Sequence, residues 1–154
     1  MIKNLVDEAV YKEVIERIDS IDDNSNRLWG KMTPHQMISH LVDQFELLKG
    51  NNDFKYKKTF VGVYIYKYLF LYIFNFPKAK VKIGKKYDKQ NGGGSPLTSM
   101  QNDKEKLKEE LTKYFKNPIV PSSVNHPFFG PLNQEQWGIF AFKHIDHHLR
   151  QFNS

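Results

Sequence analysis

The sequence contains no cysteine among its 154 residues. Disulfide bonds, thiolate metal ligands and a cysteine nucleophile are therefore excluded. The missing cysteine does not by itself fix the cellular compartment. A chain of this length is expected to form a single domain, residues 1–154, with a full hydrophobic core.

The chain also lacks a long uninterrupted apolar run. Residues 1–18 alternate charged and apolar side chains. That is not the pattern of a signal peptide, and we expect a cytoplasmic protein. The longest apolar and aromatic stretch, Phe60 to Phe76, carries Lys67 at its centre and is flanked by further charges. It is too short and too charged for a membrane-spanning helix, so we expect no membrane span.

Arginine is missing from the most basic part of the chain. The net charge is +6, from 23 basic and 17 acidic residues. Much of the excess comes from Lys55, Lys57, Lys58, Lys67, Lys78, Lys80, Lys82, Lys85, Lys86 and Lys89, with Asp88 as the one acid among them. Because bidentate phosphate recognition favours arginine, a solvated lysine surface is favoured over a patch for nucleic acid or membrane. We expect no specific nucleic-acid partner.

The spacing of apolar residues predicts helices along most of the chain. We expect them over residues 2–19, 33–49, 101–115 and 133–152. The aromatic segment 60–76 suits either a strand or a helix. Its length favours a helix, buried between neighbours or in a dimer contact. Residues 77–99, basic and then glycine-rich, are expected to form a mobile loop, and the proline-rich connector 118–131 to lie against the helices.

Two of these helices carry strong N-terminal signals. Thr33 is followed by Pro34 and, three places on, by Gln36, which is the pattern of a capping box with proline at the first helical position. Asn133 and Gln136 repeat the same spacing before the last helix. Both helix starts are therefore predicted from local chemistry alone.

The last helix mixes imidazoles into the face that should be buried. At about 100° per residue that face consists of Trp137, Phe140, Ala141, His144, His147, His148 and Gln151. His144 and His148 are four residues apart, so they lie on adjacent turns and can point at one atom. His40, in the helix over 33–49, faces inward among apolar neighbours, whereas His35 is expected to be exposed.

His40, His144 and His148 are therefore candidate ligands of a metal. Three neutral imidazoles on zinc leave a fourth position for water or substrate, as in catalytic sites, and helical bundles build such sites from facing helices. The alternative is that they are core histidines satisfied by hydrogen bonds.

Other polar residues extend this site. His147 is an alternative to His148, and His126 is a candidate fourth ligand or proton carrier. Side chains that could orient the imidazoles, or lie solvated on the surface, are Asp43, Gln44, Asp146 and Gln151.

Two segments carry a family resemblance: LWGKMTPHQMISHL, Leu28 to Leu41, and HPFFGPLNQEQWGIFAFKHIDHHLRQF, His126 to Phe152. They resemble a branch of the DinB/YfiT-like superfamily whose members are largely of unknown function. The resemblance implies an all-α, up-down four-helix bundle, here with an extra apolar segment and a long loop between helices two and three. It also implies a divalent metal, zinc or nickel, held by three histidines, which correspond to His40, His144 and His148.

Characterised relatives in that superfamily include transferases that join low-molecular-weight thiols to electrophiles and a thiol-dependent isomerase, and other members are called metal-dependent hydrolases. We therefore expect a metal-dependent enzyme that activates a thiol or water for transfer to, or hydrolysis of, a small-molecule substrate. His147 and His126 would carry protons. The alternative is a non-catalytic metal- or ligand-binding bundle, or a dimerisation module in which Phe60 to Phe76 joins two copies as a homodimer.

Overall fold

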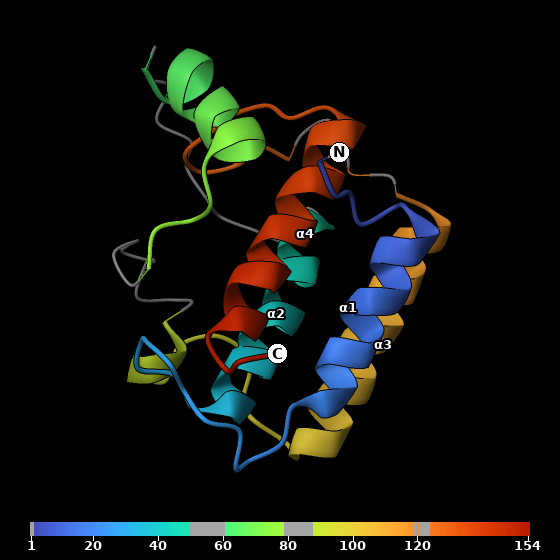
Figure 1. Ribbon diagram of the computed structural model, residues 1–154, viewed down its shortest axis with the longest axis vertical. Helices are drawn as coiled ribbons and strands as arrows, with labels where there is room; N and C mark the ends of the chain where they lie inside the picture. Colours follow the sequence, from blue (N-terminus) through green and yellow to red (C-terminus); the bar gives the residue numbers. More distant parts are fainter. Residues whose placement is uncertain (1, 50–60, 79–87, 119, 121–123) are drawn as a thin grey trace.

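A computed structural model of the protein describes residues 2–49, 61–78, 88–118, 120 and 124–154. Within these ranges the chain is helical and contains no β-strand, which confirms the all-α fold class. The α-helices are α1 (Glu8–Ser20), α2 (Pro34–Leu48), α3 (Met100–Lys116) and α4 (Gln134–Arg150). They lie side by side in Figure 1, where α2 packs against α3, and α1 contacts both α3 and α4.

The starts of α2 and α4 confirm the predicted capping boxes. The Thr33 hydroxyl accepts a hydrogen bond from the backbone N–H of Gln36 at 3.1 Å, and the Gln36 side chain accepts one from the N–H of Thr33 at 2.9 Å. Asn133 and Gln136 make the same reciprocal pair before α4. Each box satisfies N–H groups that have no partner inside the helix, so the start of each histidine-bearing helix is held in place.

The first helix begins later than residue 2, where the sequence pattern predicted it. Residues 2–7 are not helical and contain a turn at residues 5–6, where the Asn4 side chain accepts a hydrogen bond from the N–H of Val6. The N–H of Leu5 donates to the carbonyl of Gly138 on α4 at 3.3 Å, and the Leu5 side chain is fully buried. The prediction was wrong here because a contact with α4 competes with the helical pattern.

Apolar side chains at helical spacing fill the space between the helices. Among those with no exposed surface are Val14, Ile18, Met37, Leu41, Leu107, Leu111, Ile145 and Leu149. Full burial of a side chain of this size contributes about 1.5–3 kcal/mol. The hydrophobic residues of α1, α2, α3 and α4 thus form one shared core, and this core sets the distance between α2 and α4.

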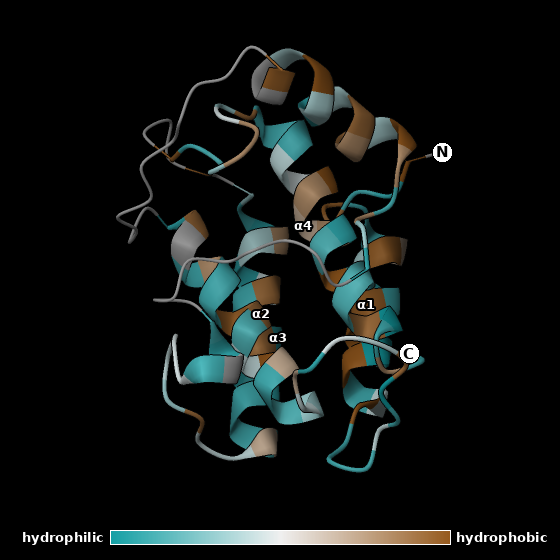
Figure 2. Cartoon of the chain, turned by 90° about the vertical axis from the view of Figure 1, so that its left-hand side faces the viewer, coloured by the Kyte–Doolittle hydropathy of each residue, from teal (hydrophilic) through white to brown (hydrophobic). Residues whose placement is uncertain are grey.

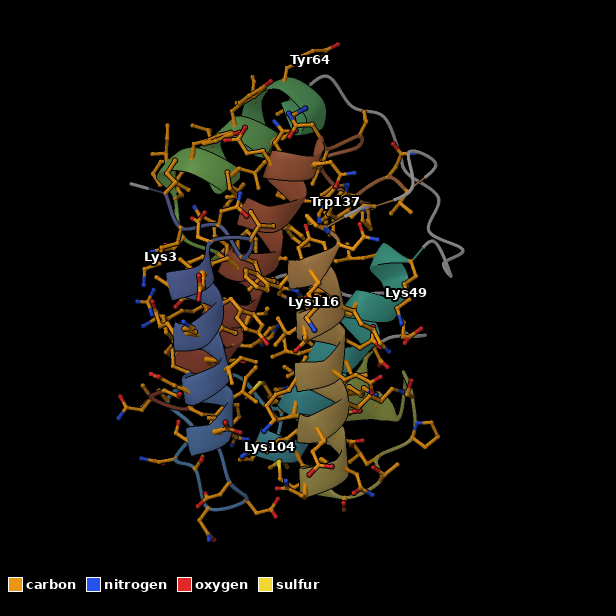
Figure 3. All side chains as sticks on the ribbon, turned by 90° about the vertical axis from the view of Figure 1, so that its right-hand side faces the viewer. Lys3, Lys49, Tyr64, Lys104, Lys116 and Trp137 are labelled. Atoms are coloured by element: carbon orange, nitrogen blue, oxygen red, sulfur yellow. The ribbon has the colours of Figure 1, made fainter. Side chains whose placement is uncertain are left out.

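Segment 61–76 is helical over residues 61–73 but is not buried as expected. It forms two wide π-helical turns, η1 (Val61–Tyr66) and η2 (Leu69–Ile73). Its large exposed side chains are Val61, Tyr64, Ile65, Tyr66, Tyr68, Ile73 and Phe74. The segment lies at one end of the molecule, where Tyr64 points away from the helices (Figure 3), and it shows apolar colours in Figure 2. Burial between neighbours within the chain was therefore a wrong expectation, whereas a dimer contact stays a prediction.

No described helix has both the length and the apolar character that crossing a bilayer requires.

Two of the lysines assigned to a solvated surface are buried. Lys89 lies in a short 3₁₀ turn, η4 (Lys89–Asn91). Its Nζ atom is 2.8 Å from the Asp43 carboxylate and donates to the Ser39 hydroxyl at 2.8 Å. Lys67 is also buried, with Nζ 3.5 Å from the carbonyl of Pro131. These two ammonium groups are held by partners from other parts of the chain, which the local sequence does not reveal. Residues 50–60 and 79–87, which carry most of the other lysines, lie outside the described residues.

His35 also differs from its predicted exposure. Its Nε2 atom lies 2.8 Å from the Asp103 carboxylate on α3, and its side chain is only 18% exposed. α3 packs on this side of α2 and covers His35. The connector behaves as predicted where it is described, because Val124 and Phe129 are buried in the core.

Candidate metal centre

Three histidines from two helices meet at one point in the core. His40 comes from α2, and His144 and His148 come from successive turns of α4. Nε2 of His144 lies 3.0 Å from Nε2 of His148 and 3.4 Å from Nε2 of His40. Each histidine offers one nitrogen such that all three lie within 4.8 Å of one another. The structure thus brings together the three residues that the sequence singled out.

These distances fit a tetrahedral metal. A Zn–N bond of about 2.0–2.1 Å places two ligand nitrogens about 3.3 Å apart, close to both measured separations. The fit also requires free lone pairs on the three nitrogens. At His40, burial favours the neutral ring and outweighs the nearby Asp43 carboxylate, which favours the protonated one.

Burial keeps the three imidazoles neutral. His40 and His148 are less than 10% exposed, and His144 is partly exposed. Removal from water lowers the pKa of His40 to about 4. Burial and the neighbouring histidines lower the pKa values of His144 and His148 well below the usual range. At neutral pH all three are therefore in the form that binds a metal.

Gln151 orients one of the three rings. Its Oε1 atom lies 2.7 Å from Nδ1 of His148, and its Nε2 atom donates to the carbonyl of Trp29 at 3.5 Å. A hydrogen bond to the second ring nitrogen is the usual way in which a metal-binding histidine is held. Nδ1 of His144, in contrast, is buried and finds no partner among the described residues.

The other side chains considered for orientation make no hydrogen bond to the cluster among the described residues. Asp43 pairs with Lys89, and Asp146 pairs with Arg17 at 2.9 Å. Both atoms of the Gln44 amide are buried and lack a hydrogen-bond partner within the described part of the chain. Of the four predicted residues, only Gln151 is seen to hydrogen-bond a histidine of the cluster.

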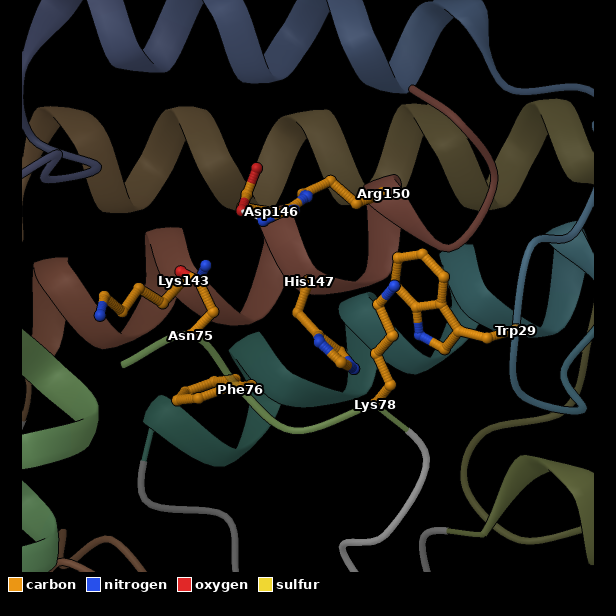
Figure 4. A pocket seen from close by; sticks show the side chains of 8 residues that line it. All are labelled: Trp29, Asn75, Phe76, Lys78, Lys143, Asp146, His147 and Arg150. Atoms are coloured by element: carbon orange, nitrogen blue, oxygen red, sulfur yellow. Dashed lines mark ion pairs between the residues drawn. The ribbon is translucent and has the colours of Figure 1, made fainter. Parts of the chain in front are cut away.

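His147 faces a pocket next to the histidine cluster. Its ring centroid is 5.1 Å from that of His148 and 6.1 Å from the indole of Trp29. The pocket has a volume of about 120 Å³ and is also lined by Phe76 and Lys78 (Figure 4). The side chain is half-buried, and this burial lowers its pKa. His147 is therefore placed between the cluster and the pocket rather than among the nitrogens of the cluster.

His126 lies in an aromatic cluster behind Phe140. Its ring stacks on Phe129 with centroids 4.4 Å apart and meets Phe140 edge-on at 4.5 Å. Its Nδ1 atom accepts hydrogen bonds from the backbone N–H groups of Phe128 and Phe129. Burial lowers its pKa to about 3. This geometry favours a structural role, with a neutral ring that closes the turn of the connector.

Two wall residues of the site were not found by sequence reasoning. Trp29 lies in the loop before α2 and Phe76 follows η2, and both line the pocket. Phe76 lies between the pocket and the histidine cluster, with its ring centroid 6.3 Å from that of His144 and 6.2 Å from that of His147. Neither belongs to a helical apolar stripe, so no periodicity signal marks them.

Comparison with known proteins adds one family match. A family described as "Protein of unknown function (DUF1569)" matches residues 96–154, which contain α3 and α4. The match includes His144 and His148 but not His40. No curated protein and no solved structure matches the chain.

Proposed function

We propose that this protein is a metal-dependent enzyme of the DinB-like superfamily, built as an up-down four-helix bundle. His40, His144 and His148 would hold a divalent cation, zinc or nickel. The observation that supports this most is the convergence of three neutral imidazole nitrogens, from α2 and α4, within 4.8 Å of one another. A cation held in this way lowers the pKa of a thiol or a water molecule, so that a nucleophile exists at neutral pH.

The residues around the cluster would prepare it for that chemistry. Gln151 keeps the proton of His148 on Nδ1 and leaves Nε2 directed at the centre. Phe140 stacks on His144 with ring centroids 5.7 Å apart, and Phe76 covers the same ring from the pocket side. These aromatic surfaces exclude water from part of the site, which strengthens electrostatic interactions inside it. His147 would exchange protons with a molecule in the pocket.

Metal content tests this proposal directly. Protein purified without an affinity tag is expected to contain one equivalent of metal by elemental analysis. His40→Ala, His144→Ala and His148→Ala should each lose it, because each removes one ligand. His147→Ala is the matched control on the same helix and should keep the metal. Retained metal in the His40 and His148 variants would remove the ligand assignment.

Turnover assays test whether the protein is an enzyme. A screen with small thiols and model electrophiles, beside a screen with hydrolysable esters and amides, separates transfer from hydrolysis. Activity should depend on the metal and be reduced in His147→Ala. A metal-loaded protein that is inactive in both screens would support the non-catalytic alternative.

The exposed apolar segment favours a second function, dimerisation. Ile73 is 67% exposed and Phe74 is 53% exposed, and exposed apolar patches of this kind mark interaction surfaces. Analytical ultracentrifugation should then show a dimer for the natural chain and a monomer for Ile73→Asp. A natural chain that is monomeric at high concentration would exclude this function.

A further inference from the structure

The pocket beside the histidine cluster carries an excess of positive charge. Its lining includes Lys78, Lys143 and Arg150 against a single carboxylate, Asp146. That carboxylate already pairs with Arg17 at 2.9 Å and with Arg150 at 3.6 Å. Positive charge that is not matched inside a concave site raises the local concentration of anions.

Lys78 is exposed, but its ammonium group lies over the Trp29 ring at the pocket. Its Nζ atom lies 4.5 Å from the centroid of the Trp29 ring, a distance typical of a cation–π contact. Lys143, in contrast, uses its ammonium group to bind the carbonyls of Phe70 and Phe74, at 2.9 and 2.8 Å. Lys78 and Arg150 are therefore the cations with hydrogen-bond donors to spare.

A buried donor points to a ligand independently of the charges. Nε1 of Trp29 is buried and has no hydrogen-bond partner among the residues that the structure describes. Figure 4 shows the nitrogen edge of this indole turned toward Lys78 and His147. A buried N–H without an acceptor is unfavourable. An anion in the pocket would supply that acceptor and would meet the Lys78 ammonium, with Arg150 on the pocket wall beside Asp146.

The same pocket adjoins the proposed metal. His147 lines it and is in ring contact with His148, and Phe76 touches both the pocket and His144. His147 and Phe76 thus separate the pocket from the three histidines of the cluster, and a molecule anchored in the pocket would approach the cluster past these two rings.

We propose that this pocket binds the anionic group, a carboxylate or a phosphate, of a small substrate, through Trp29 Nε1, Lys78 and Arg150. The substrate's reacting end then lies at the histidine cluster. The position of the reacting end rests on the proposed metal-dependent function, whereas the anion site does not depend on the metal.

Calorimetry on metal-free protein tests the anion site alone. Titrations use succinate, its neutral analogue succinamide, and inorganic phosphate. Succinate or phosphate should bind about tenfold or more tightly than succinamide, because charge-assisted hydrogen bonds to the anion are lost with the neutral group. The stronger of the two anions identifies the group that the pocket prefers. Equal binding of succinate and succinamide, or no detectable binding of any of them, overturns the proposal.

Variants then assign the contacts. Lys78→Met removes the charge and keeps an apolar side chain, and Trp29→Phe removes the N–H and keeps a ring. Each should weaken anion binding about fivefold or more. Lys116→Met, at the exposed end of α3 (Figure 3), loses the same charge far from the pocket and should bind like the natural chain. Equal weakening in Lys116→Met and Lys78→Met would show a general charge effect and contradict the assignment.

A second titration tests the link to the metal. Mercaptosuccinate carries a thiol and two carboxylates, and 2-mercaptoethanol carries the thiol alone. Zinc-loaded protein should bind mercaptosuccinate more tightly than metal-free protein does, and Lys78→Met should weaken mercaptosuccinate but not 2-mercaptoethanol. If the protein takes up no zinc, the proposed function fails while the succinate result still decides the anion site. If zinc binds but Lys78→Met weakens both thiols equally, a substrate does not contact the anion site and the metal at the same time, and the proposed position of its reacting end is wrong.

Discussion

Nδ1 of His148 and Oε1 of Gln151 lie 2.7 Å apart, and the amide of Gln151 also donates to the carbonyl of Trp29. Because an amide oxygen can only accept, His148 carries its proton on Nδ1 and exposes a lone pair on Nε2. Nε2 is the atom that faces His144, at 3.0 Å. One glutamine thus sets the tautomer of a ring in the candidate metal centre and ties that ring to the loop before α2.

Gln151→Leu should weaken zinc binding about 10- to 100-fold, the usual effect of losing the group that orients a metal-binding histidine. Competition against a chromophoric chelator measures this affinity. Gln101→Leu is the matched control, since Gln101 is exposed on α3 and its side chain pairs with Glu105. Unchanged affinity in Gln151→Leu would show that the hydrogen bond does not position the ring.

Gly30→Ala should weaken zinc binding through the same glutamine. Gly30 has φ +81°, and a Cβ there would lie 2.5 Å from Nε2 of Gln151, so the amide has to move. Gly92 has a similar φ of +77° but no atom within 4 Å of its would-be Cβ.

Gly92→Ala is therefore a control with the same backbone strain. Both variants should lose about 1–2 kcal/mol of unfolding free energy in urea, the usual effect of a left-handed backbone at a residue with a side chain. Only Gly30→Ala should lose zinc affinity. Equal zinc affinity in the two variants would contradict the coupling.

The metal-free protein should lose stability in acid because of its buried histidines. The pKa of His126 is lowered from 6.5 to about 3 and that of His40 to about 4. The unfolded chain then binds protons that the folded chain does not, so the free energy of unfolding is constant above pH 6.5 and falls as the pH drops toward 3. His126 alone accounts for at most about 5 kcal/mol of this loss.

Urea unfolding of metal-free protein at several pH values measures this slope. His126→Phe should be less stable than the natural chain at pH 7, because the N–H groups of Phe128 and Phe129 lose their acceptor. Its stability should nevertheless fall less steeply between pH 6.5 and 4. The same steepness in both proteins would argue against a neutral, buried His126.

Lys89→Met should destabilise the fold strongly. It leaves the buried carboxylate of Asp43 without its cation, and breaking a buried ion pair in this way costs about 3–5 kcal/mol. The double variant Asp43→Leu with Lys89→Met should recover much of the loss, because no buried charge remains. Lys12→Met, which removes an exposed pair with Glu8, should leave the urea midpoint unchanged. A small effect of Lys89→Met would mean that Asp43 is solvated.

Local sequence chemistry was sufficient to predict the helices that carry the three histidines. The capping boxes at Thr33 and Asn133 and the apolar spacing after them act within a few residues, so they can be recognised without knowing the fold. The four-residue spacing of His144 and His148 is likewise a property of one helix. His144 and His148 lie close to His40 because each helix turns the face that carries its histidines toward the core, where α2 and α4 meet.

Tertiary structure alone decided which partners the buried polar groups have and which residues line the pocket. Lys89 was expected at a solvated surface and His35 was expected to be exposed, yet each meets a carboxylate from another element, Asp43 and Asp103 respectively. The pocket depends on Trp29 and Lys78, which come from separate loops and carry no periodic signal. Composition and spacing describe the interactions that a residue makes along its own helix. The partners of a buried charge or the walls of a pocket come from segments far away in the sequence, so only the packed chain determines them.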